Sequence, residues 1–152
     1  MATVRPMQDT PERNIHATAL VLDGRGILIM GPSGAGKTDL AIRLIEAGGE
    51  LVADDQVLVR LEKGRAVARA PDQIAGKMEV RGFGIIDMPH RADAVIDLII
   101  DLKPRRDIER MPDPAMREID GAPVRAVELD GFEASAVAKV KLILKGLGHA
   151  RG

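Results

Sequence analysis

The sequence predicts one α/β domain in which a largely mixed or antiparallel sheet carries two main helices, at about 37–47 and 133–147. Three observations support this fold class. Short apolar runs typical of β-strands recur along the chain, whereas only two long stretches have the period of an amphipathic helix. A glycine-rich segment joins one apolar run directly to the first helix. A doubly wound domain would alternate strand and helix throughout, so we expect a different strand arrangement here.

Turn signals divide the rest of the chain into strands. The expected strands are residues 17–22, 27–30, 50–53, 57–61, 65–69, 77–81, 85–87, 95–102 and 124–129. Asp23-Gly24 and Lys63-Gly64 each stand between two β-forming runs, which is typical of hairpins. Residues 103–123 contain several prolines and many charges, so we expect an irregular connection there.

The domain boundaries are expected near the ends of the chain. Residues 1–14 are polar and predict a flexible leader, residues 15–148 a single domain, and residues 149–152 a tail. The leader lacks the apolar core of a signal peptide, and no apolar run is long enough to span a membrane. Cysteine is absent, which excludes disulfides and cysteine-ligated metal sites. We therefore expect a cytoplasmic protein without a membrane partner.

Composition limits the classes of partner. Hydrophobic residues make up 45% of the chain and charged residues 30%, and the formal net charge is −1. A nucleic-acid-binding protein would need a basic surface, so the charge balance argues against one. The aromatic residues are Phe83 and Phe132, too few to stack the bases of a single strand, and the core must be aliphatic.

The most specific feature is GPSGAGKT, a complete Walker A phosphate loop between a strand and a helix. Its residues are Gly31, Pro32, Ser33, Gly34, Ala35, Gly36, Lys37 and Thr38. The glycines allow successive backbone N–H groups to point at phosphate oxygens, and the following helix adds its positive dipole end. Lys37 can reach the β- and γ-phosphates, and the Thr38 hydroxyl can bind Mg²⁺. The loop therefore predicts a site for ATP and Mg²⁺.

Two aspartates follow the short strand at 50–53. Asp54 and Asp55 would lie at the end of a buried strand beside the phosphate loop. There, one carboxylate can hold a Mg²⁺ shell and the other can accept a proton from an attacking hydroxyl. The alternative is a pair of solvated turn aspartates. Glu79, in a strand before a Gly-x-Gly bend, fits a second Mg²⁺ ligand and an exposed strand residue equally well.

Three further residues have two interpretations each. His16 begins the first expected strand and is either a surface histidine or a site residue. Arg81 could contact a phosphate group or pair with a carboxylate. Arg110, in the proline-rich connection, could neutralise phosphoryl charge or be a solvated loop arginine. The sequence pattern leaves these alternatives open.

Four segments, in this order, resemble a known family. They are IHATA (15–19), GPSGAGKT (31–38), GELVADD (49–55) and EVRGFGII (79–86). The set is similar to the catalytic domain of bacterial HPr kinase/phosphorylase, which phosphorylates a serine of the small phosphocarrier protein HPr. The resemblance implies a phosphate-loop domain like that of phosphoenolpyruvate carboxykinase. It also implies an ATP- and Mg²⁺-dependent serine kinase that regulates a phosphotransferase system.

The resemblance also implies catalytic roles for matching residues. Asp55 would accept the proton of the HPr serine and donate it in the reverse reaction, with His16 close enough to assist. Lys37 would hold phosphate, and Arg110 stands where the family has an active-site arginine.

The metal ligands and the quaternary structure are implied in the same way. Thr38 and Glu79 would bind Mg²⁺, and Asp54 would shape the metal shell. Family members form hexamers and grip HPr with the C-terminal helix of a neighbouring subunit, so residues 133–147 are the expected docking element.

The chain departs from the family in its amino-terminal and carboxyl-terminal parts. It begins almost where the catalytic domain of the family would, so we expect a short form that lacks the additional N-terminal domain of long family members. Pro123-Val124-Arg125 matches a segment that continues Pro-Gly-Arg-Asn in the family but AVEL here. Because that family loop takes part in dephosphorylation, the kinase direction is the safer inference and phosphorolysis of phosphoserine-HPr is in question.

Two other functions remain compatible with a phosphate loop. One is a small-metabolite kinase or a relative of phosphoenolpyruvate carboxykinase, which would need a closed substrate pocket with its own arginines. The other is a non-catalytic nucleotide sensor that binds HPr. The presence of Lys37, Thr38, Asp55 and Glu79 argues against the sensor, since a decayed site should have lost at least one of them.

Overall fold

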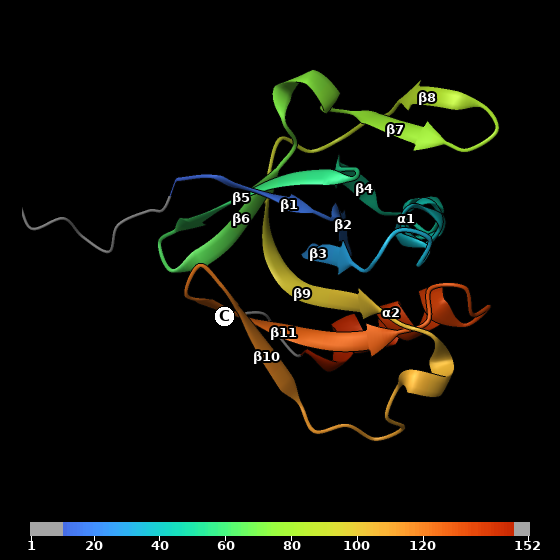
Figure 1. Ribbon diagram of the computed structural model, residues 1–152. Coiled ribbons are helices and arrows are strands. Elements are labelled where there is room, and N and C mark those ends of the chain that lie inside the picture. Colours follow the sequence, from blue (N-terminus) through green and yellow to red (C-terminus); the bar gives the residue numbers. More distant parts are fainter. Residues whose placement is uncertain (1–10, 148–152) are drawn as a thin grey trace, which may run out of the picture.

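The computed structural model describes residues 11–147, and Figure 1 shows a curled sheet with its helices on one side. The strands are β1 (Arg13–His16), β2 (Thr18–Leu22), β3 (Arg25–Met30), β4 (Glu50–Ala53), β5 (Gln56–Glu62), β6 (Arg65–Arg69), β7 (Lys77–Val80), β8 (Gly84–Asp87), β9 (Ala94–Leu102), β10 (Ala115–Ile119) and β11 (Ala122–Leu129). The helices are α1 (Lys37–Glu46) and α2 (Ala136–Gly146), with short 3₁₀ turns at Asp72–Ile74 and Arg105–Asp107.

Strand β9 is the centre of the main sheet. The strand order is β1-β5-β6-β9-β3-β2-β4, and the β10–β11 hairpin joins the sheet through β11, which also pairs with β9. β9 is antiparallel to β6 at its beginning and parallel to β3 and β11 further along. The sheet is therefore mixed, as predicted, and β7 and β8 form a separate two-stranded sheet.

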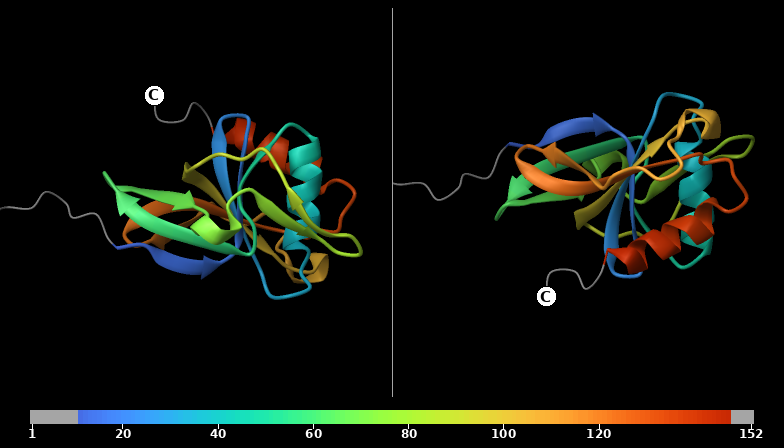
Figure 2. Two further views of the ribbon diagram at one scale, coloured as in Figure 1. Left: turned by 90° about the horizontal axis from the view of Figure 1, so that it is seen from above. Right: turned by 90° about the horizontal axis from the view of Figure 1, so that it is seen from below.

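The main sheet is buried on both faces, because alternate residues of its central strands enter two different apolar clusters. In β9, Ile99 packs into the apolar cluster on the face away from the helices. Leu98 and Ile100 pack into the other cluster, against the helices. Helices α1 and α2 lie together over that second face (Figure 2). Each helix directs a short apolar stripe at the sheet. In α1 this stripe contains Leu40 and Leu44. This explains the nearly continuous apolar runs in the sequence.

The two predicted helices are confirmed, although α2 begins at Ala136 rather than at residue 133. Two strands were not predicted. β1 lies within mostly polar residues and takes two residues of the expected leader, so His16 ends β1 instead of beginning the next strand. β10 lies in the segment 103–123, where we expected no regular structure. Residues 1–10 of the leader and the tail at 149–152 lie outside the described residues.

The β10–β11 hairpin turns at Asp120-Gly121, where both residues have positive φ angles of 50° and 93°. This is the turn type that an Asp-Gly pair favours. Pro123 stands in β11 opposite Glu118 of the edge strand β10. Between residues 11 and 147, neither helix is long and apolar enough to cross a membrane.

Gly26 of β3 is the point where the chain passes closest to β9. A Cβ atom on Gly26 would lie 1.9 Å from the carbonyl oxygen of Val95. We expect Gly26→Ala to lower the free energy of unfolding by about 3 kcal/mol, because a backbone clash inside the sheet cannot be relieved by a side-chain rotation. Urea unfolding followed by far-ultraviolet circular dichroism measures this.

Gly146→Ala is the matched control for this substitution. Gly146 lies in the last turn of α2 with no heavy atom within 4 Å of an added Cβ, so alanine should leave stability unchanged or raise it by up to about 1 kcal/mol. Equal stability of Gly26→Ala and wild type would contradict the close approach of β3 and β9.

Candidate active site

The candidate site lies at one edge of the main sheet. Strands β3, β4, β9 and β11 run in the same direction, because β3 and β11 are parallel to β9, and β2 is antiparallel to both β3 and β4. Their carboxyl ends therefore meet at one edge, the right-hand side of Figure 1. Ligands of α/β proteins bind preferentially at such an edge. The phosphate loop follows β3, and Asp54-Asp55 follows β4.

The phosphate loop joins β3 to the amino terminus of α1. Gly34 and Gly36 have φ angles of 84° and 95°, a region that glycine enters without strain. Lys37 is 8% exposed, and its Nζ donates to the carbonyl oxygens of Gly31, at 2.6 Å, and Pro32, at 3.3 Å. Its ammonium group is thus folded back over the loop that the sequence predicts for phosphate.

Asp54 is a buried carboxylate shared by several elements. It is 7% exposed, and its Oδ1 accepts hydrogen bonds from the hydroxyls of Thr18, at 3.1 Å, and Thr38, at 3.3 Å. The backbone of Glu79 also favours the ionised form of this carboxylate. Burial nevertheless raises the pKa of Asp54 above its ordinary value, because these hydrogen bonds offset only part of the desolvation and Asp55 adds a second negative charge.

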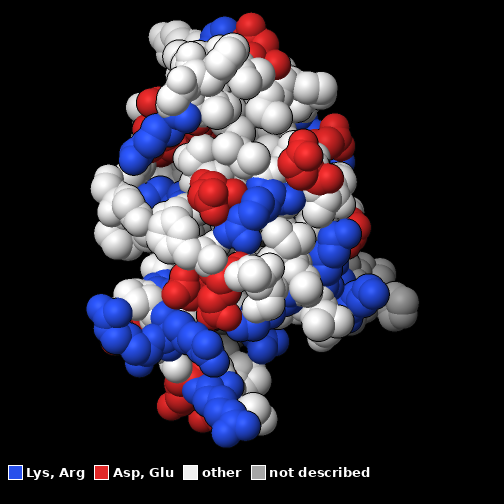
Figure 3. Space-filling model, turned by 90° about the vertical axis from the view of Figure 1, so that its right-hand side faces the viewer, with Lys and Arg blue, Asp and Glu red and all other residues white. Residues whose placement is uncertain are grey.

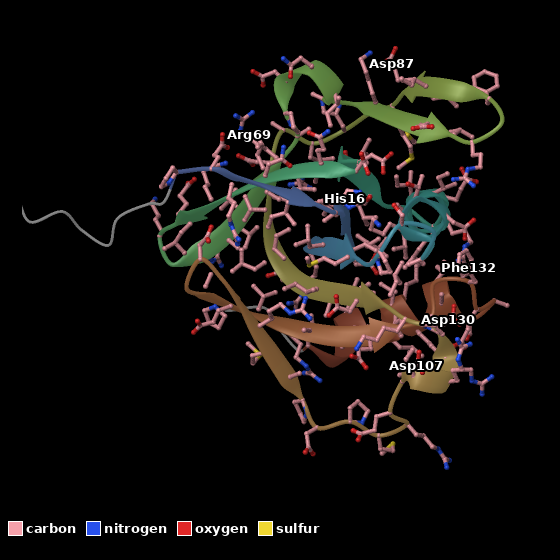
Figure 4. All side chains as sticks on the ribbon, viewed as in Figure 1. His16, Arg69, Asp87, Asp107, Asp130 and Phe132 are labelled. Carbon is pink, nitrogen blue, oxygen red and sulfur yellow. The ribbon has the colours of Figure 1, made fainter. Side chains whose placement is uncertain are left out.

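Asp55 has the opposite environment. Its side chain is 65% exposed, and its Oδ1 lies 2.7 Å from Nε2 of His16. An ionised carboxylate can only accept, so Nε2 donates. Figure 4 shows His16 at the end of β1.

The backbone at Asp55 is an unusual turn. Its φ is 70°, and the N–H of Gln56 donates to the carbonyl oxygen of Asp54 at 2.8 Å, a bond between residues two apart that is typical of the strained γ-turn. The segment between β1 and β2 holds this turn in place. The N–H of Ala17 donates to the carbonyl oxygen of Asp55, at 3.2 Å, and the N–H of Asp55 donates to Thr18 Oγ1, at 3.4 Å.

The predicted residues are brought together to different degrees. Asp54 is in contact with Thr38, and Asp55 is in contact with His16. Because Asp54 is buried, the interpretation as a solvated turn aspartate does not fit it. The side chain of Glu79 is exposed on β7. Within residues 11–147, no group of three or more potential metal-ligating His, Asp or Glu side chains is found.

Arg81 and Arg110 are exposed at opposite ends of this edge, in the turn after β7 and in the segment after β9. Figure 3, which looks onto this edge, shows Lys and Arg side chains gathered over its lower part. Arg105, Arg106 and Arg110 are exposed residues of the segment between β9 and β10. No side-chain hydrogen bond or ion pair joins Arg110 to the other site residues in the described part of the chain.

Sequence reasoning missed Thr18. Its side chain is completely buried and bridges the two aspartates, donating to Asp54 and accepting from the backbone of Asp55. A signal was present, because Thr18 is the one polar residue in the apolar run ATALVL and a buried hydroxyl needs a partner.

The fold and these groups define a mixed α/β domain with a glycine-rich loop and paired acidic residues at the carboxyl edge of its sheet. A model of the HPr Serine kinase C-terminal domain matches residues 8–140, and the chain belongs to that family. It is 38% identical over 130 residues to HPr kinase/phosphorylase of Clostridium tetani and 37% identical over 127 residues to that of Variovorax paradoxus.

These alignments include 78% and 75% of this chain, but the chain spans only 43% and 40% of the two relatives. Among solved structures, the Hpr(Ser) kinase/phosphatase from Coxiella burnetii has the same fold, with a TM-score of 0.80 at 23% identity. The match covers 89% of this chain and 95% of that one.

The raised pKa of Asp54 predicts a pH dependence of stability. Between the ordinary aspartate pKa of about 3.9 and the higher native value, the folded protein holds more protons than the unfolded chain. The stabilisation that follows from the raised pKa of Asp54 is fully present below the ordinary aspartate pKa. It is lost as the pH rises through the native pKa. Asparagine does not ionise, so we expect the free energy of unfolding of Asp54→Asn, relative to wild type, to increase as the pH rises above about 4.

Urea unfolding at several pH values in Mg²⁺-free buffer measures this difference. Asp87→Asn removes an exposed carboxylate on β8 and controls for the loss of one negative charge. A difference between Asp54→Asn and wild type that stays constant with pH would contradict the assignment.

Proposed function

We propose that this chain is the catalytic part of a protein-serine kinase that transfers the γ-phosphoryl group of ATP to a serine of the phosphocarrier protein HPr, and so regulates a phosphotransferase system. Membership of the HPr serine kinase family supports the reaction class. The observation that carries the proposal for this chain is the pairing of Asp55 with His16 beside the phosphate loop. The mixed sheet around this loop agrees with a phosphate-loop domain like that of phosphoenolpyruvate carboxykinase.

The acceptor chemistry rests on Asp55. Because its carboxylate is exposed at the carboxyl edge, it can reach the hydroxyl of a serine on a protein surface, whereas the buried Asp54 cannot. Asp55 would remove the hydroxyl proton as the serine oxygen attacks the γ-phosphorus and ADP leaves. His16 would fix the carboxylate through its hydrogen bond. In the reverse direction, inorganic phosphate would attack the phosphorus of phosphoserine and give up a proton, and the protonated Asp55 would return a proton to the departing serine oxygen.

The residues present fit a magnesium ion. The Thr38 hydroxyl and the Asp54 carboxylate lie 3.3 Å apart and offer the oxygen ligands that Mg²⁺ prefers, and Mg²⁺ commonly uses few protein ligands together with substrate phosphates. Glu79, exposed on β7, is the third proposed ligand. When bound, Mg²⁺ would neutralise charge on the β- and γ-phosphates. The loop N–H groups and Lys37 would hold the phosphates, and Arg110 would add positive charge from the segment after β9.

The partner and assembly follow the family. We propose HPr as the protein substrate, a homo-oligomeric assembly and α2 as the helix that contacts HPr on a neighbouring subunit. α2 carries an exposed leucine, Leu142, that is 65% exposed. We also propose a cytoplasmic location, which agrees with ATP and HPr as the two substrates. The family match does not favour a small-metabolite kinase or a sensor without turnover.

The proton-acceptor role predicts the behaviour of Asp55→Asn. Incubated with ATP, Mg²⁺ and HPr, the wild-type protein should form phosphoserine-HPr. The variant should be slower by about 10²–10⁴-fold, because it cannot accept the serine proton, and should bind ATP normally. Excess inorganic phosphate added after the forward reaction tests the reversal.

Asp87→Asn is the matched control, since Asp87 lies in β8 and pairs with Lys77 in β7. It should retain the wild-type rate. A wild-type rate in Asp55→Asn would remove the proton-acceptor assignment, and absence of transfer by the wild-type protein would overturn the proposed acceptor.

The magnesium assignment predicts a difference between two substitutions of Thr38. Thr38→Val keeps the shape but removes the hydroxyl, so the gain in ATP affinity on adding Mg²⁺ should fall by at least about tenfold. Thr38→Ser keeps the hydroxyl and should retain the gain. Calorimetric titration with and without Mg²⁺ measures both, and an unchanged gain in Thr38→Val would contradict the assignment.

A further inference from the structure

Both aromatic side chains of this protein are exposed. Phe83 is 77% exposed and Phe132 63%, and tryptophan and tyrosine are absent. The largest completely buried side chains are leucines, isoleucines and one methionine. Aromatic rings are among the side chains that gain most from burial. Single exposed apolar residues are ordinary on protein surfaces, so the position of each ring decides whether it has a role there.

Phe132 lies directly on the phosphate loop. An added Cβ on Gly36 would be 2.9 Å from Cζ of Phe132 and 3.0 Å from Cε1, so the edge of the ring covers the backbone of Gly36. Gly36 is the residue before Lys37 and caps the amino terminus of α1. Figure 4 shows Phe132 at the edge of the sheet where the phosphate loop lies. A substitution of Gly36 would displace the ring.

The loop that carries Phe132 is fixed by hydrogen bonds from two sides. The carboxylate of Asp130 accepts from the N–H of Phe132, at 2.9 Å, and from the N–H of Arg105, at 3.1 Å. The Arg43 guanidinium of α1 donates to the carbonyl oxygens of Gly131 and Glu133.

Gly131 also packs against the phosphate loop. A Cβ there would meet the side chain of Leu102 at 3.2 Å and the carbonyl oxygen of Ala35 at 3.5 Å. The ring is therefore held at a defined place beside the loop, although most of its surface is exposed.

We propose that Phe132 is the stacking platform for the base of the nucleotide, an inference that rests on the proposed binding of a nucleoside triphosphate. A phosphate loop holds the phosphates with N–H groups and a lysine, which leaves the base outside the loop against a neighbouring surface. Every base has a π-face, so an aromatic ring binds it favourably and with little selectivity between bases. Phe132 gives this chain such a surface in contact with the loop.

Tryptophan reporters test the placement of the base. Because the chain has no tryptophan or tyrosine, Phe132→Trp introduces a single fluorophore, and ATP should quench its emission. Tripolyphosphate, which has the phosphates without a base, should not quench it. Phe83→Trp is the matched control, since Phe83 lies in the turn between β7 and β8 and is not part of the proposed platform; ATP should not quench it. Equal quenching of Phe132→Trp by ATP and tripolyphosphate would overturn the proposal.

Affinities measured by calorimetry give the second readout. We expect Phe132→Ala to weaken ATP binding by about five- to a hundredfold and to leave tripolyphosphate binding within about twofold of wild type. Phe132→Trp should restore ATP binding. Phe83→Ala should bind both ligands as wild type does.

Three other results would overturn the platform. An equal loss of both ligands in Phe132→Ala would show that the ring only supports the loop. Unchanged ATP affinity with a raised KM for HPr would assign the ring to the acceptor protein. Wild-type protein that binds tripolyphosphate as tightly as ATP would exclude a base platform while leaving the phosphate loop intact. Wild-type protein that binds neither ligand would instead overturn the proposed function itself, so the two failures are distinguishable.

Discussion

The site depends on one interaction, the hydrogen bonding of the buried Asp54 carboxylate. It joins the first residue of β2, through Thr18, to the first turn of α1, through Thr38. These bonds fix where β2, β4 and α1 meet at the site, in addition to the apolar packing of α1 against β2 and the pairing of β2 with β4. A buried carboxylate without these partners would cost several kcal/mol, about the whole net stability of a marginal domain. The buried charge therefore constrains the geometry of the site.

Much of the fold was predictable because its signals are local. The Walker A residues, the helix that Gly48 and Gly49 end, and the hairpin at Asp23-Gly24 all follow from short-range preferences. β10 was missed even though Asp120-Gly121 carries the same turn signal, because the prolines nearby argued against a strand; Pro123 is tolerated beside an edge strand. β1 was missed because it is mostly polar, and its pairing with β5 joins residues far apart in the sequence.

The site was predictable as a set of residues and less so as an arrangement. Asp54 and Asp55 are neighbours in the sequence with opposite environments, one 7% exposed and the other with a side chain that is 65% exposed. Strand alternation cannot assign them, because the γ-turn after β4 changes the direction of the chain. The positive φ of Asp55 is a strained conformation that the bonds to Ala17 and Thr18 maintain, and such strain is concentrated at functional sites. Thr18 thus fixes both aspartates; its place in an apolar run indicates a buried hydroxyl, but not which groups that hydroxyl contacts.

The desolvation of Asp54 also has a consequence for ligand binding. Its pKa is raised because hydrogen bonds from two hydroxyls do not fully replace water around a negative charge. A divalent cation at the Thr38–Asp54 pair would supply the missing positive charge, and it would bind the folded state in preference to the unfolded chain, raising stability by mass action. The energetic cost of burying Asp54 would then be recovered on cation binding, and the same carboxylate would couple the packing of β2, β4 and α1 to the occupancy of the proposed site. An exposed carboxylate in its place, such as that of Asp55, would bind the cation without this coupling.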